Sequence, residues 1–579
     1  MNGWSGRMLS VDLTAGICTV DEIPEKLLHA YLGGRGLGVR FMRDSHRLHP
    51  FDPAMPLIFS VGPLCGTSAP TAARLSVVSR SPLTGTIYDC SAGGKFAWRL
   101  KGAGYDLLRI AGISPQPVTL VIGESGGELI PADVLWGTTI PVTVAALEGL
   151  GSVAAIGPAG ENGVLFANIM MGEGNSVGRG GLGAVMGRKR LKAVVVNGSR
   201  NSIIAQRDRF QTARTDVMRL LRASPVIFGE LGLAEYGTPA LVDLMKQRRM
   251  APTENFSKTW FSDSHRYSGP AMRAECAAVK DGCHGCPIQC KKSTPQGEHL
   301  PEYETVSHFG ALNGISDLQA IVKANTLCNE LGMDTISAAA TVAAWGEARG
   351  RFPHAGEMSG ILESIAHRRG EGELLAQGSR RATEILGRPE LSMSIKSLEL
   401  PAYDPRGAYG MALAYCTSGR GGCHLRAYPI SHEILRKPVA TDRFSFSGKA
   451  RIITIAEDTN AAVDSLVACK FSFLGASMEE YSELLSAATG VEYTPQGLKE
   501  IGKRICLTER FYNCANGFDF RHDQLPDRFF TQPGSSGDGI EIPPLDRERF
   551  DQELQKYYRI RGLTPEGTFA DPGFLEQQP

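Results

Sequence analysis

The chain has 579 residues, of which 42% are hydrophobic, so two or three domains are expected rather than one hydrophobic core. Lys and Arg total 61 and Asp and Glu also total 61, which removes the electrostatic argument for a nucleic-acid or anionic-membrane partner. The N-terminus has no signal-peptide pattern, and no apolar run approaches the roughly 18 residues of a membrane span. We therefore predict a cytoplasmic protein with no membrane span.

Short β-type runs, separated by Gly, Pro, Asn or Asp, occupy the N-terminal third of the chain. The runs are MLSVDL, PLIFSVG, ARLSVVSRSP, DLLRIAG, PVTLVIG, AAIGPAG and LKAVVVNG. The 67 glycines follow no fixed period and indicate many close backbone approaches, including approaches to a large polar ligand. This pattern predicts a β-rich domain over residues 1–202.

Long amphipathic stretches replace the β-type runs in the rest of the chain. They include FQTARTDVMRLLRAS, DLQAIVKANTLCNELG, ISAAATVAAWGEARG, GILESIAHRRGEGELLAQGSRRATEILG and PQGLKEIGKRICLTERFYN. The proline-containing segment RPELSMSIKSLELPAYDPRGAYG interrupts them near residue 400. We predict an α+β protein in which two mainly α-helical domains, residues 203–400 and 401–579, follow the β-rich domain.

Glycine-rich loops in the N-terminal part suggest phosphate binding without matching a nucleotide motif. GRGGLG at 178–183 has the Gly-x-Gly-x-x-Gly spacing, but the following VVVNGSRN lacks the expected acid, and the chain has no P-loop sequence. Arg74, the SAGGK turn at 91–95, and Arg179 with Gly180 form a set suited to binding phosphates. Turn glycines of a β-rich domain would explain the same residues equally well.

The strongest local signal is GCHGCPIQC, which places Cys283, Cys286 and Cys290 in a Cys-x-x-Cys-x-x-x-Cys array. Closely spaced thiols in an intracellular chain bind an iron–sulfur cluster or zinc, and either metal group needs a fourth ligand. A zinc site closed by a distant Cys or His is the alternative that the spacing leaves open. The eight cysteines other than these three, Cys423 and Cys469 stand in apolar or small-residue surroundings typical of buried free thiols. Cys423 differs because it lies in the glycine-rich RGGCHLR, and Cys469 differs because it ends the helical stretch DSLVACKF.

An ordered series of motifs covers the chain almost from end to end. The series is GGRGLG, GPLCGTSAPTAARLSVVSRSPLTG, SAGGK, AAIGPAGEN, GRGGLGAVMG, GCHGCPIQC, PEYET, CNELGMDTIS, RGGCHLRA and DSLVACKF. With these motifs in this order, the sequence resembles the aldehyde:ferredoxin oxidoreductase family. In that family an N-terminal β-rich domain forms the base for two pterins, and two helical domains close over them, which matches the predicted order of strands and helices.

The resemblance implies three cofactor groups and their ligands. A [4Fe-4S] cluster would be held by four thiols, those of Cys283, Cys286, Cys290 and Cys469. A tungsten or molybdenum bis-pterin would be bound without a protein ligand to the metal. One pterin phosphate and a bridging magnesium would lie at Arg74, Ser91, Gly93, Arg179 and Gly180. The second pterin would contact Asn329, Met333, Thr335, Arg426, Asp464 and Ala468.

Several positions depart from the family pattern. Asn329 stands where the first pterin motif has Asp, and Val467 with Ala468 replaces Gly-Leu in the second motif. Ser91 stands where an Asn is expected. A Glu-x-x-His iron-binding motif of some members is absent, with residues 323–326 in its place, so we expect no such iron.

The resemblance also assigns the catalytic groups. Oxidation of a hydrated aldehyde needs a base near the attacking oxygen and a donor to the carbonyl oxygen. Glu304 of PEYET would be the base and His424 of RGGCHLR the donor. Glu302 is a competing carboxylate, and both Glu304 and His424 would otherwise be read as ordinary structural residues.

We expect an oxidoreductase that interconverts an aldehyde and its carboxylic acid and passes electrons through the cluster to ferredoxin or a partner subunit. One alternative is the catalytic subunit of a multi-subunit tungsten reductase, including reductases of aromatic thioesters. A second alternative is a zinc-stabilised binding protein without redox activity. The expected partners are a small aldehyde or acid, an electron-transfer protein, and further subunits in a homo- or hetero-oligomer.

Overall fold

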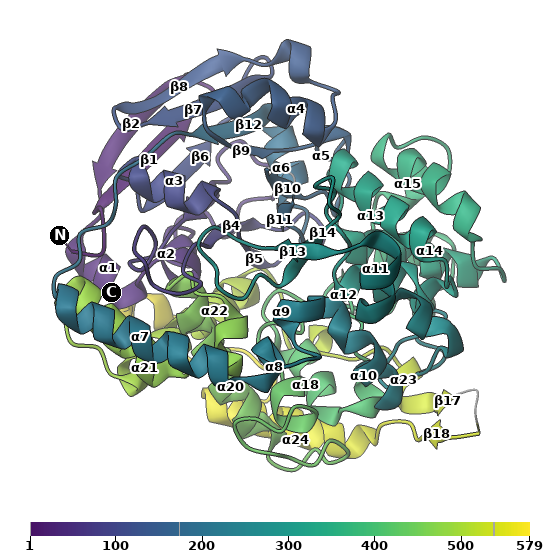
Figure 1. The fold of residues 1–579 in the computed structure, drawn as a ribbon. Helices are drawn as coiled ribbons and strands as arrows, with labels where there is room; N and C mark the ends of the chain where they lie inside the picture. Colours follow the sequence, from purple (N-terminus) through teal and green to yellow (C-terminus); the bar gives the residue numbers. More distant parts are fainter. Residues whose placement is uncertain (1, 173, 536–538) are drawn as a thin grey trace.

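The computed structural model describes residues 2–172, 174–535 and 539–579. Two six-stranded sheets fill the N-terminal part, and helices make up most of the rest (Figure 1). The predicted α+β class, with a β-rich part preceding a mainly helical part, is confirmed. The finer division into three domains ending at residues 202 and 400 stays a prediction.

The first sheet has the strand order β2-β1-β6-β3-β4-β5. Its strands are β1 Arg7–Asp12, β2 Ile17–Glu22, β3 Leu57–Ser60, β4 Leu75–Arg80, β5 Ile87–Ala92 and β6 Leu107–Ala111. β1 and β6 pair in parallel, whereas the other neighbours are antiparallel. Edge strand β5 ends at Ser91 and Ala92, so the sheet presents the predicted phosphate-binding turn at one end.

The second sheet has the strand order β11-β10-β9-β12-β7-β8. Its strands are β7 Val118–Gly123, β8 Gly126–Pro131, β9 Ser152–Ala155, β10 Ile169–Met171, β11 Asn175–Val177 and β12 Leu191–Val196. Every residue of the central strand β12, which has a neighbouring strand on each side, is buried. The buried ammonium of Lys192 in this strand forms an ion pair with Glu161. β11 leads directly into the GRGGLG loop.

Six α-helices accompany the sheets: α1 Glu25–Tyr31, α2 Gly34–Arg40, α3 Phe96–Gly102, α4 Ile140–Leu147, α5 Pro158–Glu161 and α6 Leu182–Arg188. The GGRGLG motif forms helix α2 despite its low helix propensity. A Cβ at Gly34 would lie 2.3 Å from the Asp464 carbonyl oxygen, and one at Gly38 would lie 2.4 Å from Val78. These glycines therefore allow α2 to fit between the first sheet and the C-terminal helices.

The longer helices of the remaining chain include α7 Arg207–Ala223, α13 Leu318–Leu331, α14 Thr335–Ala348, α20 Lys449–Ser465, α21 Met478–Thr489, α22 Pro495–Ala515 and α24 Arg547–Arg561. The shorter ones are α8 Pro225–Phe228, α9 Leu233–Tyr236, α10 Leu241–Gln247, α11 Gly269–Cys276, α12 Tyr303–Phe309, α15 Met358–Ala366, α16 Gly372–Leu375, α17 Ser379–Ile385, α18 Tyr409–Thr417, α19 Ile430–Glu433 and α23 Arg528–Thr531. Among the described residues, two-stranded sheets pair β13 Val279–Asp281 with β14 Lys291–Ser293, β15 Ser394–Ile395 with β16 Leu398–Glu399, and β17 Gly534–Ser535 with β18 Glu541–Ile542.

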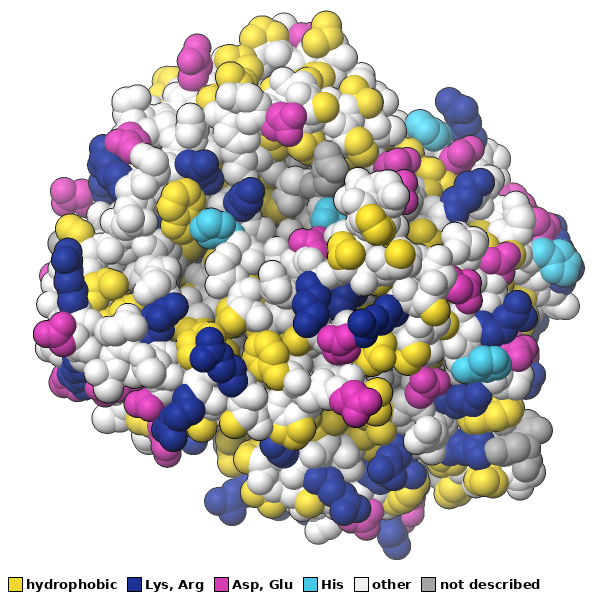
Figure 2. Space-filling view, in the orientation of Figure 1, with side chains coloured by type: hydrophobic (Ala, Val, Ile, Leu, Met, Phe, Trp, Pro, Cys, Tyr) yellow, Lys and Arg dark blue, Asp and Glu magenta, His cyan; other side chains and the backbone are white. Residues whose placement is uncertain are grey.

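Hydrophobic packing joins the two ends of the chain. One core cluster combines Leu28 and Leu37 of the N-terminal helices with Leu221 of α7, Tyr481 of α21 and Leu498 of α22. Figure 1 shows α7, α21 and α22 beside α1 and α2. The face drawn in Figure 2 carries acidic and basic side chains spread among apolar ones, in keeping with the zero net charge. Within the described residues, no helix is long and apolar enough to cross a membrane.

Candidate active site

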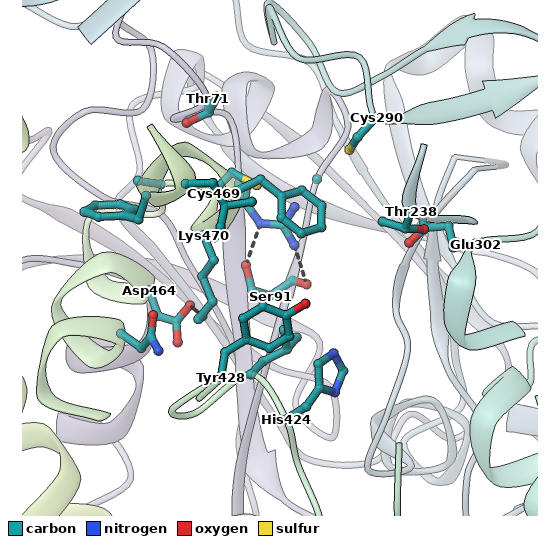
Figure 3. Close-up of a pocket in the computed structure, with 18 of the residues that line it drawn as sticks. Thr71, Ser91, Thr238, Cys290, Glu302, His424, Tyr428, Asp464, Cys469 and Lys470 are labelled. Carbon is teal, nitrogen blue, oxygen red and sulfur yellow. Dashed lines mark hydrogen bonds and ion pairs between the residues drawn. The ribbon is translucent and has the colours of Figure 1, made fainter. Parts of the chain in front are cut away.

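A cavity of about 1290 Å³ lies where the two sheets meet the helical part. All the sequence-predicted site residues except Gly180 line it. A Cβ at Gly180 would lie 2.5 Å from the Tyr88 ring, so Gly180 packs against β5 beside the cavity. Figure 3 shows Cys469, Lys470 and Asp464 together on one wall of the cavity, with Thr238 and Glu302 on another.

The hairpin between β13 and β14 carries three of the predicted cluster thiols, and Cys469 follows helix α20. Burial raises the pKa of Cys286 to about 11, and the Cys469 thiol adds to this rise. Burial and Cys469 likewise raise the pKa of Cys290. The four thiols therefore lie near enough to affect one another's pKa values. In this structure, no three His, Cys, Asp or Glu side chains of the described residues are arranged to hold a metal ion. Four soft thiol donors facing one cavity fit the chemistry of an iron–sulfur cluster.

The other candidate ligand, Cys423, has a different environment. Its sulfur accepts hydrogen bonds from Arg420 Nη2 at 2.9 Å and from the Leu425 backbone at 3.3 Å. Burial raises its pKa, but the charges of Arg420, Arg426 and Arg179 outweigh burial and lower it. The structure thus groups Cys469, rather than Cys423, with the thiols of the hairpin.

Arg74 connects the thiols to the SAGGK turn. Its Nε donates to the Ser91 hydroxyl and its Nη2 to the Ser91 carbonyl, both at 3.0 Å (Figure 3). A Cβ at Gly93 would lie 2.2 Å from the Cys283 sulfur, so this position has no room for a side chain. Lys95, the last residue of the motif, is exposed and lies outside the cavity lining.

Arg179 fastens the GRGGLG loop to the helical part. Its Nη2 donates to the Glu399 carbonyl at 2.7 Å and its Nη1 to the Gly422 carbonyl at 3.1 Å. Its Nε lies 3.3 Å from an Asp334 carboxylate oxygen. These contacts fix the guanidinium at the cavity wall. A bound phosphate would have to share the guanidinium N–H donors with the Glu399 and Gly422 carbonyls and with Asp334.

The junction between α13 and α14 presents the first pterin motif. Asn329 lies in the last turn of α13, and Asp334 caps α14 by accepting from the backbone N–H groups of its first turn. The Met333 carbonyl accepts from the Asn168 side chain at 2.9 Å. The Thr335 hydroxyl lies 2.8 Å from that of Thr305. The junction is thus held by the N-terminal part and by α12, with Asn329 facing the cavity.

A buried network of charges surrounds the second pterin motif. Arg426 forms an ion pair with Asp89 and lies 3.5 Å from Asp464, which also pairs with Lys470 and lies 3.4 Å from Arg35. The buried Arg426 Nε has no hydrogen-bond partner among the described residues. A donor left in this state is costly unless a ligand accepts from it. The residues here therefore fit a polar, negatively charged group such as a pterin phosphate.

The backbone beside this network is strained. Val467, which replaces the glycine of the family motif, has φ of +54° although it is β-branched. Such a conformation costs about 1–2 kcal/mol in an L-residue. It turns the chain sharply after α20, and the Ala468 N–H then donates to the Val463 carbonyl at 3.1 Å. The turn thus keeps Ala468 and Cys469 at the cavity wall without a glycine.

Glu304, in the first turn of α12, is the carboxylate at the centre of the cavity wall. Its Oε2 accepts from the Ala402 N–H at 2.9 Å, whereas its buried Oε1 has no hydrogen-bond partner among the described residues. His424 Nε2 lies 3.7 Å from Oε1, and His308 Nδ1 lies 3.5 Å from Oε2. Burial raises the pKa of Glu304 to about 8, although the Ala402 N–H and Arg179 oppose the rise.

His424 completes a pair with Glu304. Burial lowers the pKa of its imidazole well below the usual range, and the charges of Arg179 and Arg420 lower it further, so the ring is neutral at pH 7. Its buried Nδ1 has no hydrogen-bond partner among the described residues. The rings of Tyr403 and Tyr428 lie 5.4 Å and 5.9 Å from it, centroid to centroid.

Glu302, the competing carboxylate, differs from Glu304 in environment. Its side chain is 51% exposed and lies 3.3 Å from the Lys291 ammonium. The geometry therefore places Glu304, and not Glu302, beside His424.

Several residues of the site were missed by sequence reasoning: Arg35, Asp89, His308, Tyr403, Arg420, Tyr428 and Lys470. Arg35 lies within GGRGLG and Lys470 directly follows Cys469, so their position in the motifs was the available signal. The tyrosines have no local signal, because they reach the site only through the tertiary fold.

Comparison with known proteins agrees with the fold. The sequence profile of the aldehyde ferredoxin oxidoreductase N-terminal domain matches residues 8–198, and that of domains 2 and 3 matches residues 212–572. The tungsten-containing aldehyde ferredoxin oxidoreductase of Pyrococcus furiosus is 39% identical over 595 residues, covering 98% of this chain and 97% of the relative. That of Thermococcus kodakarensis is 39% identical over 597 residues, covering 98% and 97%.

A solved structure, the active site complex BamBC of benzoyl coenzyme A reductase with 1,5-dienoyl-CoA, shares the fold. The TM-score is 0.83 at 24% identity, with 98% of this chain and 96% of the other covered. The curated relatives are oxidoreductases that contain tungsten. The chain therefore belongs to the aldehyde ferredoxin oxidoreductase family, and it is an oxidoreductase.

Proposed function

We propose that the protein oxidises an aldehyde to its carboxylic acid at a tungsten bis-pterin and passes the electrons through a [4Fe-4S] cluster to ferredoxin or a partner subunit. The observation that carries the proposal is the buried Glu304–His424 pair. Each residue has an unpartnered polar atom, and both line the cavity that the four thiols and the buried charge network also line. Unpartnered catalytic groups of shifted pKa in a shared cavity are typical of an active site.

The reaction takes up an aldehyde and water and yields a carboxylic acid, two protons and two electrons. When bound, the tungsten bis-pterin supplies the two-electron redox chemistry and the cluster carries single electrons onward. The Glu304 Oε1 atom would take the proton released as water adds to the carbonyl carbon. The neutral His424 would donate its Nε2–H to the carbonyl oxygen as that oxygen gains negative charge. Tyr403 and Tyr428 would limit the access of bulk water.

The chain would hold the cofactors with the residues that the resemblance assigned. Cys283, Cys286, Cys290 and Cys469 would bind the cluster. Arg74, Ser91, Gly93, Arg179 and Gly180 would form the first pterin phosphate and magnesium site, in which the Ser91 hydroxyl already accepts from Arg74. Asn329, Met333, Thr335, Arg426, Asp464 and Ala468 would contact the second pterin, with the Arg426 Nε donating to it.

A second candidate function is that of the catalytic subunit in a larger tungsten reductase. The fold similarity to a reductase active site complex supports this alternative. Copurification of the chain with dedicated iron–sulfur or flavin subunits, together with inactivity toward aldehydes, would favour it over the first.

The test is to purify the protein without oxygen from its native host, measure tungsten, molybdenum, iron and zinc per chain, and screen aldehydes with a viologen dye as electron acceptor. About one tungsten and about four irons per chain, with aldehyde-dependent dye reduction, is the expected result. Zinc in place of tungsten and iron would overturn the redox proposal and favour a zinc-stabilised binding protein.

A further inference from the structure

A small basic and aromatic surface forms where α3 contacts the cysteine hairpin. It consists of Lys95, Trp98 and Arg99, at the start of α3 and within it, together with His284 and Gly285 of the hairpin loop. We name it the α3 face. Lys95 and His284 are exposed, and Trp98 and Arg99 are half-buried.

The rings of this face contact one another. The Trp98 and His284 ring centroids lie 5.2 Å apart, and the Arg99 guanidinium carbon lies 5.1 Å from the centroid of the Trp98 ring. His284 stands between the predicted cluster ligands Cys283 and Cys286 in the sequence. The α3 face therefore contacts the hairpin loop that carries Cys283 and Cys286.

The α3 face carries two cations, Lys95 and Arg99, and no carboxylate among its own residues. Lys95 has no ion-pair partner in the part of the chain that the structure describes, and Arg99 donates only to the Gly198 carbonyl, at 3.0 Å. A chain with no net charge thus presents two cations beside its cysteine hairpin.

We propose that the α3 face is the docking site of a small, negatively charged electron-transfer protein. This inference rests on the proposed function and adds to it the face and the charge of the partner. Opposite charge steers association and fixes orientation, and Trp is a common binding anchor. One electron would pass from the reduced cluster to the oxidised carrier across the hairpin, without transfer of atoms.

Binding of the holoenzyme to an acidic single-cluster ferredoxin tests the proposal, measured by isothermal titration calorimetry at low and high salt. Lys95→Glu is expected to weaken binding at low salt by at least about fivefold and to reduce its salt dependence. The matched controls are Lys95→Arg, which keeps the charge, and Arg559→Glu, which reverses an exposed charge on α24. Both controls are expected to bind within about twofold of the wild type.

Three results would overturn the docking site. One is unchanged binding of Lys95→Glu, another is equal weakening by Lys95→Glu and Arg559→Glu, and the third is a holoenzyme that oxidises aldehydes with viologen but binds no ferredoxin. Zero-length carbodiimide cross-linking adds a second readout, because it should join Lys95 to a carboxylate of the carrier. Loss of viologen-linked oxidation in the wild type would instead overturn the proposed function, while the titration would still test the face.

Discussion

Replacing Glu304 by Gln separates its proposed proton transfer from its packing. The amide keeps the shape of the side chain and can still accept from the Ala402 N–H, but it cannot take up a proton. Because a positioned acid or base contributes about 10²–10⁴-fold, kcat/KM for aldehyde oxidation should fall by that factor, with tungsten and iron content unchanged. The matched control is Glu302→Gln, which alters an exposed carboxylate two residues away and should keep most of the activity.

The pH dependence of the wild-type rate gives a second test of the role of Glu304. With a pKa of about 8, the side chain is about 1% carboxylate at pH 6 and about half carboxylate at pH 8, so the wild-type rate should rise about 50-fold over this interval. A carboxyl group with an ordinary pKa would be ionised throughout and give no rise. Initial rates with viologen at saturating dye, from pH 6 to pH 9, measure the profile. A flat wild-type profile, or a Gln variant as active as the wild type, would refute the role of Glu304.

Three further substitutions test the residues that line or support the proposed cofactor sites. Cys469→Ala should lower iron below four per chain and change the cluster signal in electron paramagnetic resonance; a full four-iron cluster would exclude Cys469 as a ligand. Gly93→Ala should also lower iron content, because its Cβ would overlap a cluster thiol, whereas Gly123→Ala, with open space around it, should not. Gly34→Ala should lower both the melting temperature and the tungsten content, since its Cβ would meet the backbone of α20. Gly16→Ala, which has a positive φ but open space, should lower the melting temperature less and leave tungsten in place.

The order of strands and helices could be predicted because turn residues bound each apolar run. PLIFSVG and LKAVVVNG became β3 and β12, and DLQAIVKANTLCNELG became α13. The amphipathic stretch that begins at Gly360 forms three helices, α15, α16 and α17, with breaks at Gly370 and Gly378, which both have positive φ. Strands such as β10 and β11 were missed because three residues are too few for a periodic pattern.

The site was predictable only where ligands are close together in the sequence. The hairpin thiols are separated by two and three residues, so their spacing alone indicated a metal group. Glu304 and His424 come from distant segments, and only the family resemblance joined them before the structure placed His424 Nε2 3.7 Å from the carboxylate. The glycines Gly34 and Gly38 of GGRGLG make room for protein segments rather than for a ligand, and no local pattern indicates which of the two a glycine serves.

The separation of the cluster thiols along the chain has a consequence for folding. A cluster bound to Cys283 and Cys469 would cross-link two segments about 190 residues apart, and in the chain-entropy model closing such a loop restricts the unfolded chain by about 5 kcal/mol. The bound cluster would then stabilise the folded helical part in addition to carrying electrons. Iron supply during synthesis would thereby influence how much of the chain survives proteolysis, before any substrate is turned over.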